Sequence, residues 1–595
     1  MPLTNERHLY RRLRRWAASG ASWLLRGQQN QFYFLGALIG LISGASAVAF
    51  HGSISWAEDN IIYRFARLDS PWKFPLVILT PALGGLIAGW VLARFAPQAR
   101  GSGIPQTKAA YYMRFGRIRF QTGFWKFILG TLTIGTGGSL GREGPTVQIA
   151  ASFSSFVGRW LGLAPREVAR LIPMASAGGI AAAFNTPLAA IMFAIEEIMG
   201  DLKHRALAGI VLVAVIAAVM EHTLLGSHAT FSVPSHEEFS VLELGWSVIV
   251  GLQAGVTSEA FVATLLHVRQ RGLAIRSRWK WALPALGGLG TGITGAVVLF
   301  ACGRAGVFGI GYADLTDALF GNIGLWVLLA LLAGKFIATI SSYSSGGAGG
   351  IFAPTLFLGA MLGGAVGALA TVISPEAEFF ASSLAVIGMG AMFAGIIRAP
   401  VTSILMIFEL TRDYALILPI MLANLIAYTV AGRLRHIPIY EALLLQDGVN
   451  LRRFPIMRPS ENWKELPVNT IMTHEAIALQ IDEPLPEANT EIAHRTFCLF
   501  PVLDTSGRYH GMVHRKGIER VAVTHPERNV GDVLVDPPVP VVHPDEPIRE
   551  IVRRFVRTEH TTLPVISRVD PGRLLGVVTL HDITRQQFRQ EDRAT

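Results

Sequence analysis

The chain has 595 residues, 51% of them hydrophobic and only 16% charged, and its formal net charge is +10 at pH 7. Its two cysteines, Cys302 and Cys498, are too few and too far apart for a disulfide framework or a zinc site. The basic charge comes without the interleaved aromatic and basic residues of a nucleic-acid-binding motif, so the composition argues against nucleic acid as a partner.

Residues 1–32 form a basic N-terminal segment. Arginines outnumber acids in this stretch, which contains one acid, Glu6, and the arginines Arg7, Arg11, Arg12, Arg14, Arg15 and Arg26. No small-residue cleavage site follows a short apolar core, which argues against a removable signal peptide. An arginine-rich, acid-poor start also fits an organelle transit peptide, but we expect a cytoplasmic amphipathic segment.

Residues 33–445 have the composition of a membrane domain. Apolar runs rich in Gly and Ala dominate, for example 73–94, 205–220, 281–301 and 323–340. A helix needs ~20 apolar residues to cross a bilayer, so this region has room for many crossings. Several runs are shorter or are broken by Gly and Pro, which predicts helices that enter the bilayer and stop beside a buried or wet site.

Two glycine-rich turns repeat one pattern. Residues 137–146 and 346–355, offset by 209 residues (346 minus 137), share a glycine pair, a further glycine and a Pro-Thr pair that opens an apolar run. Pro suits the first turn of a helix, and glycine lets backbone amides approach a ligand closely. Because helix N-termini attract anions, we expect two anion-attracting helix ends, one from each half of the domain.

A second pair of segments extends the repeat. Residues 187–197 and 400–410 align at an offset of 213 residues (400 minus 187), with Pro, Ile and Glu coinciding. Two collinear matches at nearly one offset predict duplicated halves, about 33–225 and 240–436. Chance similarity between Gly- and Ala-rich segments is the alternative, but the matches fall on turn residues and charges. Duplicated membrane halves commonly place a substrate site near mid-bilayer, between broken helices.

Four motifs resemble, in order, those of the CLC family of chloride channels and chloride/proton exchangers. They are Gly101-Ser102-Gly103-Ile104-Pro105, Gly141-Arg142-Glu143-Gly144-Pro145, Gly349-Gly350-Ile351-Phe352-Ala353-Pro354, and Tyr440 in Ile437-Pro438-Ile439-Tyr440. The resemblance covers about residues 33–445. It implies an α-helical polytopic membrane fold with inverted-repeat halves, a homodimer, and a separate anion pathway in each subunit. Gln106 departs from the pattern, because several exchangers have glutamate after the proline.

The resemblance assigns chloride ligands. The hydroxyls of Ser102 and Tyr440 and the amides of Ile351 and Phe352 are the expected donors. A hydroxyl can bond a halide without adding charge. Taken alone, Ser102 also fits a helix N-cap and Tyr440 an interfacial anchor, but the joint pattern favours an anion site.

Glu143 is the expected gating glutamate. Its carboxylate is an anion, so deprotonated Glu143 can occupy the position that chloride takes, while the protonated form loses that attraction and swings away. Protonation and chloride occupancy then compete for one electrostatic site. The simpler interpretations are a stabilising acid in the first turn of a helix, or a partner of Arg142.

Glu196 and Glu197 lie together on the apolar run 187–199. Ionisable residues inside membranes are expensive and usually line a pathway or have a partner. Glu196 has a counterpart, Glu409, in the other half, which predicts a shared structural role such as capping buried amides. Glu197 faces Leu410 in the alignment and falls where exchangers of the family carry an internal proton-transfer glutamate.

The composition changes after about residue 450. A linker over 446–465 leads to a second duplication, in which Phe500-Pro501-Val502-Leu503 and Gly511-Met512-Val513 pair with Leu563-Pro564-Val565-Ile566 and Gly576-Val577-Val578. This tail resembles a tandem of cystathionine-β-synthase-type (CBS) domains, over 466–522 and 529–588. The resemblance implies a cytoplasmic α/β module.

The second copy carries Thr579 and Asp582 in the Thr-x-x-Asp pattern that such domains use on ribose and phosphate. The equivalent residues of the first copy, His514 and Gly517, lack those ligands. An adenine nucleotide is therefore one expected ligand of the CBS pair, and purely structural dimerisation is the alternative. Thr and Asp also favour helix starts, so capping explains them equally well.

The sequence thus predicts chloride transport across a membrane, as proton-coupled antiport that uses Glu143 and Glu197. The alternatives are a voltage- or pH-gated chloride channel of the same fold and, further off, a CBS-regulated cation transporter. The cation reading lacks converging acidic oxygen ligands in the membrane region. We expect no enzymatic activity, no required cofactor and no metal site. We expect a bacterial inner-membrane protein whose N-terminus and CBS domains are cytoplasmic.

Overall fold

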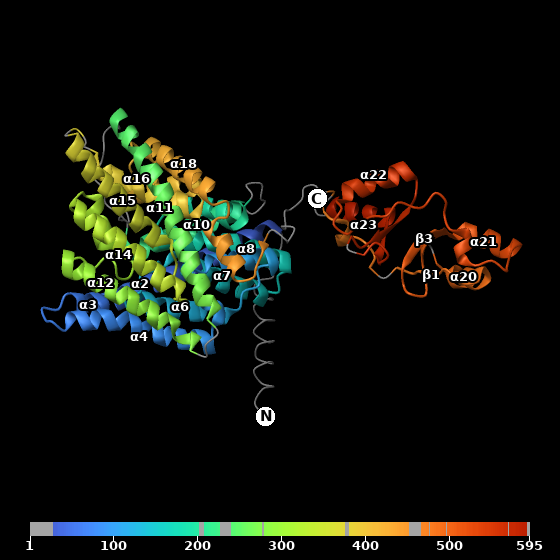
Figure 1. Ribbon diagram of the computed structural model, residues 1–595, viewed down its shortest axis with the longest axis horizontal. Helices are drawn as coiled ribbons and strands as arrows, with labels where there is room; N and C mark the ends of the chain where they lie inside the picture. The colour runs from blue at the N-terminus through green and yellow to red at the C-terminus, as the bar shows by residue number, and fades with distance from the viewer. Residues whose placement is uncertain are drawn as a thin grey trace, which may run out of the picture. The chain divides into compact units, whose positions relative to one another are not determined.

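The computed structural model describes residues 28–591 apart from 201–206, 227–239, 276–278, 375, 377–379, 452–463, 465, 475, 496 and 569. The arginines of the basic N-terminal segment and most of the expected linker 446–465 lie outside the described residues. The chain divides into two compact units, one up to Ile456 and one from Met457 onward (Figure 1).

The first unit is built from helices. Those of its first half are α2 (Gln28–Asn60), α3 (Ile62–Ala66), α4 (Lys73–Arg94), α5 (Ile104–Met113), α6 (Phe120–Gly135), α7 (Glu143–Trp160), α8 (Pro165–Phe184), α9 (Pro187–Phe193) and α10 (Leu207–Leu225). Those of its second half are α11 (Val241–Ala274), α12 (Leu283–Cys302), α13 (Tyr312–Leu319), α14 (Leu325–Ser344), α15 (Phe352–Ile373), α16 (Ala381–Ile397), α17 (Pro400–Thr411), α18 (Ile417–Leu434) and α19 (Ile439–Gln446).

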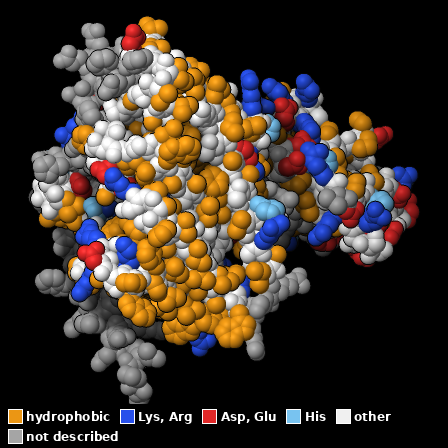
Figure 2. Space-filling model, turned by 60° about the vertical axis from the view of Figure 1, so that its left-hand side comes forward, with side chains coloured by type: hydrophobic (Ala, Val, Ile, Leu, Met, Phe, Trp, Pro, Cys, Tyr) orange, Lys and Arg blue, Asp and Glu red, His pale blue; other side chains and the backbone are white. Residues whose placement is uncertain are grey.

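Eight helices in the described part of the chain are long and apolar enough to cross a membrane, judged by length and composition. The expected runs 73–94, 205–220, 281–301 and 323–340 correspond to α4, α10, α12 and α14. These helices expose large apolar side chains, such as Leu83, Leu286 and Phe300, and hydrophobic side chains cover much of the face of this unit in Figure 2. Soluble monomers rarely expose so much contiguous apolar surface, so lipid is the matching solvent.

The expected short, broken helices are also present. Helices α9 and α17 start at Pro187 and Pro400 and are only 7 and 12 residues long. The first continues as a π-helical turn, Ala194–Met199, which ends at Gly200, and the second ends at Arg412 in a left-handed conformation. Pro opens each helix because its missing N–H has no intrahelical acceptor there.

The two halves contact each other reciprocally. Helices α4 and α12 pack side by side (Figure 1). A Cβ added at Gly85 would lie 2.2 Å from the Pro284 carbonyl oxygen, and one added at Gly288 would lie 2.1 Å from the Pro81 carbonyl oxygen. Each half therefore offers a glycine to the proline turn of the other, as expected for two inverted repeats.

The second unit has strands and helices in two similar copies. The first contains β1 (Leu479–Gln480), α20 (Leu485–Ile492), β2 (Leu499–Leu503), β3 (Tyr509–His514) and α21 (Arg515–Thr524). The second contains α22 (Ile548–Thr558), β4 (Thr562–Ile566), β5 (Leu574–Thr579) and α23 (Leu580–Glu591). Strands β2 and β3 pair antiparallel, as do β4 and β5, with Pro501 opposite Met512 and Pro564 opposite Val577. The predicted duplication is thus a repeated strand pair.

The two copies exchange their leading segments. Thr473, in the leading segment of the first copy, exchanges backbone hydrogen bonds with Val577 on β5 of the second copy, at 2.9 and 3.0 Å. Val535, in the leading segment of the second copy, donates its amide to the Met512 carbonyl on β3 of the first copy at 2.9 Å. Each copy therefore completes the sheet edge of the other.

Candidate functional site

The two glycine-rich turns meet in space. Gly141 and Gly350 exchange two backbone hydrogen bonds, each 2.7 Å long. Gly137 and Gly346, which occupy equal places in the two turns, have φ angles of 99° and 104°, a region that favours glycine. This pairing brings the N-termini of α7 and α15 together, so the sequence repeat corresponds to one joint site.

Loops that precede two short helices complete the turns. The Gly101 amide, just before α5, donates to the Gly347 carbonyl at 3.1 Å. The Gly309 amide, just before α13, donates to the Gly137 carbonyl at 3.3 Å. Each half thus supplies a loop that holds the glycine-rich turn of the other.

Glu143 is the first residue of α7 and is fully buried. Its Oε2 accepts a hydrogen bond from the Ala353 amide at 3.2 Å, in the first turn of α15. Its Oε1 accepts one from the Tyr312 hydroxyl, also at 3.2 Å. The carboxylate of the first half therefore lies at the positive N-terminal end of a helix of the second half, where an anion is stabilised.

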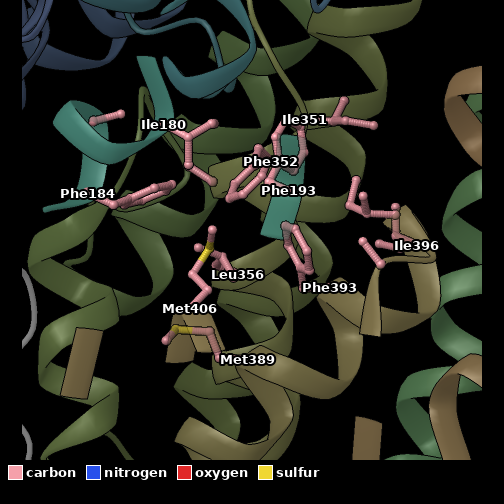
Figure 3. Close-up of a cluster of buried hydrophobic side chains, with 14 of the residues drawn as sticks. Ile180, Phe184, Phe193, Ile351, Phe352, Leu356, Met389, Phe393, Ile396 and Met406 are labelled. Atoms are coloured by element: carbon pink, nitrogen blue, oxygen red, sulfur yellow. The ribbon is translucent and has the colours of Figure 1, made fainter. Parts of the chain in front are cut away.

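The amides of Ile351 and Phe352 lie at the same end of α15, where backbone donors have no acceptor within the helix. The Phe352 ring packs against Phe184, Phe193 and Phe393, with ring centroids 5.4, 6.1 and 4.5 Å away (Figure 3). Its side chain therefore belongs to the apolar cluster, and only its backbone is available as a polar ligand.

Ser102 and Tyr440 contribute two buried hydroxyls. Ser102 is fully buried and Tyr440 is 1% exposed, and within the described residues neither hydroxyl has a hydrogen-bond partner of ordinary geometry. They belong to neighbouring parts of the fold, because α19 packs against α5, which Ser102 directly precedes. The Ser102 side chain also lies against the start of α7, where a Cβ on Gly144 would be 2.5 Å from its Oγ.

Buried hydroxyls without partners are costly in a protein interior. Two such donors beside the ends of α7 and α15 fit a small dehydrated anion, which accepts hydrogen bonds and brings no donor of its own. A cation would need acidic oxygen ligands. Among the described residues, Glu143 is the carboxylate that is hydrogen-bonded at the ends of α7 and α15. The donor set fits an anion better than a cation.

Glu197 lies in the π-helical turn and is 6% exposed. Its Oε1 is 2.9 Å from the Nζ of Lys108 on α5, and both side chains are largely buried. Gln106, on the same helix, accepts a hydrogen bond from the Gly103 amide at 3.0 Å, so its side-chain amide caps α5. Helix α5 thus carries a capping amide near Ser102 and a cation at Glu197.

Known protein families and solved structures match this chain. The model of the voltage gated chloride channel family matches residues 84–432, and the model of the CBS domain matches 468–523 and 530–588. The H(+)/Cl(-) exchange transporter ClcA of Vibrio parahaemolyticus is 31% identical over 421 residues, which are 69% of this chain and 88% of that protein. ClcA of Salmonella typhimurium is 32% identical over 427 residues, with 69% and 87% covered.

The chain belongs to the voltage gated chloride channel (CLC) family. A solved slow cyanobacterial Cl-/H+ antiporter has a TM-score of 0.63 with this chain at 26% identity. The match covers 71% of this chain and 97% of the antiporter chain. A eukaryotic CLC transporter has a TM-score of 0.62 at 21% identity and covers 93% of this chain and 97% of that structure, so it shares the fold. The predicted CLC-type fold with tandem CBS domains is confirmed.

In this CLC chain, the pair Glu196 and Glu409 caps helices reciprocally. Glu196 accepts from the amides of Val401 and Thr402 at 3.4 and 2.9 Å, at the start of α17. Glu409 accepts from the amides of Leu188 and Ala189 at 3.0 and 2.8 Å, at the start of α9. The expected capping role is confirmed, and it separates Glu196 from its neighbour Glu197.

Two buried lysines of the CLC unit were not expected from its motifs. Lys126 on α6 donates to the carbonyls of Ala99 and Gly101, at 3.0 Å in the first case, beside Ser102. Lys335 on α14 donates to four carbonyls, those of Gly306, Val307, Gly309 and Ile310, at 2.8 to 3.4 Å. They are 209 residues apart, the offset of the glycine-rich turns, so the alignment that revealed the turns could also have revealed these lysines.

Tyr312 and Lys108, which bond the two expected glutamates, were also missed. Neither lies in a motif with a fixed role. The same offset of 209 residues aligns Tyr312 with Gly103, one residue after Ser102. That alignment could have indicated Tyr312 as a second hydroxyl near the site. Nothing in the sequence pairs Lys108 with Glu197.

In the CBS unit, Thr579 and Asp582 bond each other. Asp582 Oδ2 accepts from the Thr579 amide at 2.9 Å and from its hydroxyl at 2.7 Å, and Thr579 Oγ1 accepts from the Asp582 amide at 3.2 Å. The pair caps the start of α23, as the simpler interpretation holds. In the first copy, His514 Nδ1 accepts from the Lys516 amide at 3.1 Å, and nothing lies within 4 Å of a Cβ built on Gly517.

Proposed function

We propose that the chain exchanges chloride for protons across a membrane. The observation that carries this proposal is the position of Glu143, whose buried carboxylate is bonded to the Ala353 amide at the N-terminus of α15. A carboxylate and a chloride ion compete for such a position. The ClcA relatives are named as H(+)/Cl(-) exchange transporters, which supports the same activity.

The cycle follows from that competition. Chloride binds to the hydroxyls of Ser102 and Tyr440 and to the amides of Ile351 and Phe352. Protonation of Glu143 removes the charge that holds it on the Ala353 amide, and the position becomes open to an anion. When Glu143 loses its proton again, its carboxylate displaces the anion.

Glu197 is the inner proton-transfer residue in this proposal. It is buried beside α5, and Lys108 compensates its negative charge. A buried carboxylate with a compensating cation can be held in the membrane interior and still take up a proton. Its neighbour Glu196 is occupied with capping and takes no part in transfer.

The remaining assignments of the proposal concern assembly and location. We assign the chain to a homodimer with one anion pathway per subunit, in a bacterial inner membrane, with the N-terminus and CBS domains in the cytoplasm. The CBS pair binds an adenine nucleotide through Thr579 and Asp582, which release their mutual cap to do so. The test of this last point is calorimetric titration of the full chain with ATP, in which Asp582→Ala abolishes binding.

The central experiment measures reversal potential in liposomes under imposed chloride and pH gradients. An exchanger shifts its reversal potential with the pH gradient, whereas an uncoupled chloride channel of the same fold does not. Glu143→Gln keeps the shape of the side chain and removes its charge, so we expect anion flux to persist without proton coupling. Retained coupling in this variant would refute the role of Glu143, and a wild-type reversal potential indifferent to pH would establish the channel.

A further inference from the structure

Tyr312 bonds the proposed gate from the second half. It is the first residue of α13, and its hydroxyl donates to Glu143 Oε1 at 3.2 Å. The other carboxylate oxygen, Oε2, is bonded to the Ala353 amide at 3.2 Å. The second half therefore supplies one hydroxyl and one amide to this carboxylate.

The backbone on which Tyr312 stands is held independently of Glu143. Lys335 bonds four carbonyls of the loop before α13, and Glu58 on α2 accepts from the Ile310 amide at 2.9 Å. The adjacent Gly311 has a φ of 83°, where a side chain would be strained. A rigid loop of this kind keeps the hydroxyl in place when Glu143 leaves.

The ring of Tyr312 has its own contact. The Arg142 guanidinium lies 5.5 Å from the centre of the ring, a cation–π distance. Replacing the tyrosine by phenylalanine preserves the ring contact and removes only the hydroxyl. The hydroxyl can therefore be tested without disturbing the packing of α13.

The repeat gives this hydroxyl a counterpart. At the offset of 209 residues, Ser102 aligns with Gly311, and Gly103 aligns with Tyr312. Each half thus carries one hydroxyl at the entry to a short helix, Ser102 before α5 and Tyr312 at the start of α13. The hydroxyl of the second half comes one residue later and on a longer side chain, and it reaches the position of the Glu143 carboxylate instead of the position beside Tyr440.

We propose that Tyr312 is a chloride ligand of the outer position, where its hydroxyl and the Ala353 amide bind the ion once Glu143 has left. This inference rests on the proposed function, because it requires that an anion replaces the carboxylate. It adds a side-chain donor that no motif assigns. The pathway then has a hydroxyl at each of two positions, Ser102 with Tyr440 at the inner one and Tyr312 at the outer one.

The same donor serves both competitors. Tyr312→Phe removes a hydrogen bond from the Glu143 carboxylate and from the chloride that replaces it, so the competition between them changes little in the wild-type background. In a Glu143→Ala background only the ion loses the bond. A hydrogen bond to an ion is worth enough that we expect chloride occupancy of the outer position to fall by about tenfold at subsaturating concentration.

The experiment is bromide anomalous diffraction from crystals of Glu143→Ala, with and without Tyr312→Phe. Bromide replaces chloride and gives one peak per occupied position. The peak beside Ser102 and Tyr440 is the internal reference, and Tyr428→Phe is the matched control. Tyr428 also stacks its ring on an arginine, Arg398, at 5.8 Å, so this variant removes a hydroxyl while keeping the ring contact.

Support for the inference is an outer peak in Glu143→Ala that is lost with Tyr312→Phe and kept with Tyr428→Phe, while the inner peak is constant. An outer peak that survives Tyr312→Phe, or that is absent already in Glu143→Ala, overturns the role of Tyr312 and leaves the proposed function standing. Absence of the inner peak from all crystals overturns the proposed anion site itself. Melting temperatures identify any misfolded sample. We expect those of the two phenylalanine variants to agree within about 2 °C, because each variant loses one hydroxyl and keeps its ring contact.

Discussion

Single residues distinguish two adjacent glutamates by their bonding partners. Glu196 bonds two backbone amides of α17, whereas Glu197 bonds the side chain of Lys108. Protonation of a carboxylate that caps amides through both oxygens weakens that cap, because the protonated oxygen becomes a donor. A carboxylate paired with one lysine side chain caps no helix, so the bonding partners separate two residues that the sequence places side by side.

Glu197→Gln tests that separation. The amide keeps an acceptor for Lys108 but cannot carry a proton, so we expect proton flux to fall by about 100-fold, the typical worth of a positioned acid–base group. Chloride flux should persist. Proton and chloride fluxes measured together in liposomes check this.

The control for this prediction is Glu196→Gln, which retains a capping oxygen for Thr402. We expect it to keep coupled transport with a modest loss of thermal stability. Undiminished proton flux in Glu197→Gln, or equal loss of coupling in both variants, would contradict the assignment.

Asp504, in the turn between β2 and β3, gives the CBS unit a pH dependence. Hydrogen bonds from the Ser506 hydroxyl, the Arg508 amide and His510 hold the pKa of Asp504 well below its usual value. A depressed pKa means that the folded state prefers the carboxylate. The resulting stability is present above the ordinary aspartate pKa of about 3.9 and is lost as the pH falls below it.

We expect Asp504→Asn to lower the melting temperature of the CBS unit at pH 7, with a difference from wild type that stays nearly constant down to about pH 4 and shrinks as the pH falls further toward about 2. Differential scanning calorimetry of the full chain between these pH values measures it. Asp482→Asn, at an exposed aspartate of the same copy, is the control. A difference that stays constant with pH would contradict the sign of the effect.

Glycines allow pairs of helices in the membrane unit to pack closely. The contacts between these helices are therefore sensitive to any added side-chain volume. At Gly288 a Cβ would meet the Pro81 carbonyl oxygen at 2.1 Å and its carbon at 2.5 Å. These atoms are backbone and cannot rotate away. The α4 and α12 helices must separate to admit even a methyl group.

Gly288→Ala is therefore expected to destabilise the fold by about 1–3 kcal/mol, the usual cost of overpacking. Gly245→Ala on α11 is the matched control, because nothing lies within 4 Å of its added Cβ. There, the intrinsic preference of alanine for helix should stabilise slightly. Melting temperatures of the two variants in detergent should move in opposite directions, and equal shifts would contradict the packing argument.

Many of the helices and of the contacts between them were predictable from the sequence. Apolar runs marked α4, α10, α12 and α14, because a bilayer demands a minimum apolar length. The repeat at 187–197 and 400–410 predicted the capping of Glu196 and Glu409, since equal charges at equal places imply equal partners. The contact between Glu197 and Lys108 was not predictable, because it joins α5 to a π-helical turn 89 residues away through side chains alone.

The whole chain is two units with separate cores. The membrane unit has one large apolar core and two small apolar clusters, and the CBS unit has two cores of its own, around Leu479 and Leu563. The exchange of leading segments lies within the CBS unit. Both copies are therefore needed together.

We expect residues 457–595 alone to unfold cooperatively, and residues 1–456 alone to retain chloride flux in liposomes. Circular dichroism and chloride efflux measure the two. A fragment of residues 457–525 is the control, because it lacks Val535, which bonds Met512, and it should not fold. A stable 457–525 fragment, or an unfolded 457–595 fragment, would contradict the exchange of segments.

The mutual bonds of Gly141 and Gly350 also order events in time. A ribosome adds about 5–20 residues per second, so the second glycine leaves it on the order of 10–40 s after the first. Throughout that interval the first half rests in the bilayer with a polar turn that hydrocarbon cannot satisfy. The insertion machinery or trapped water must shelter this turn until Gly350 arrives, so the site closes only after the second half has begun to insert.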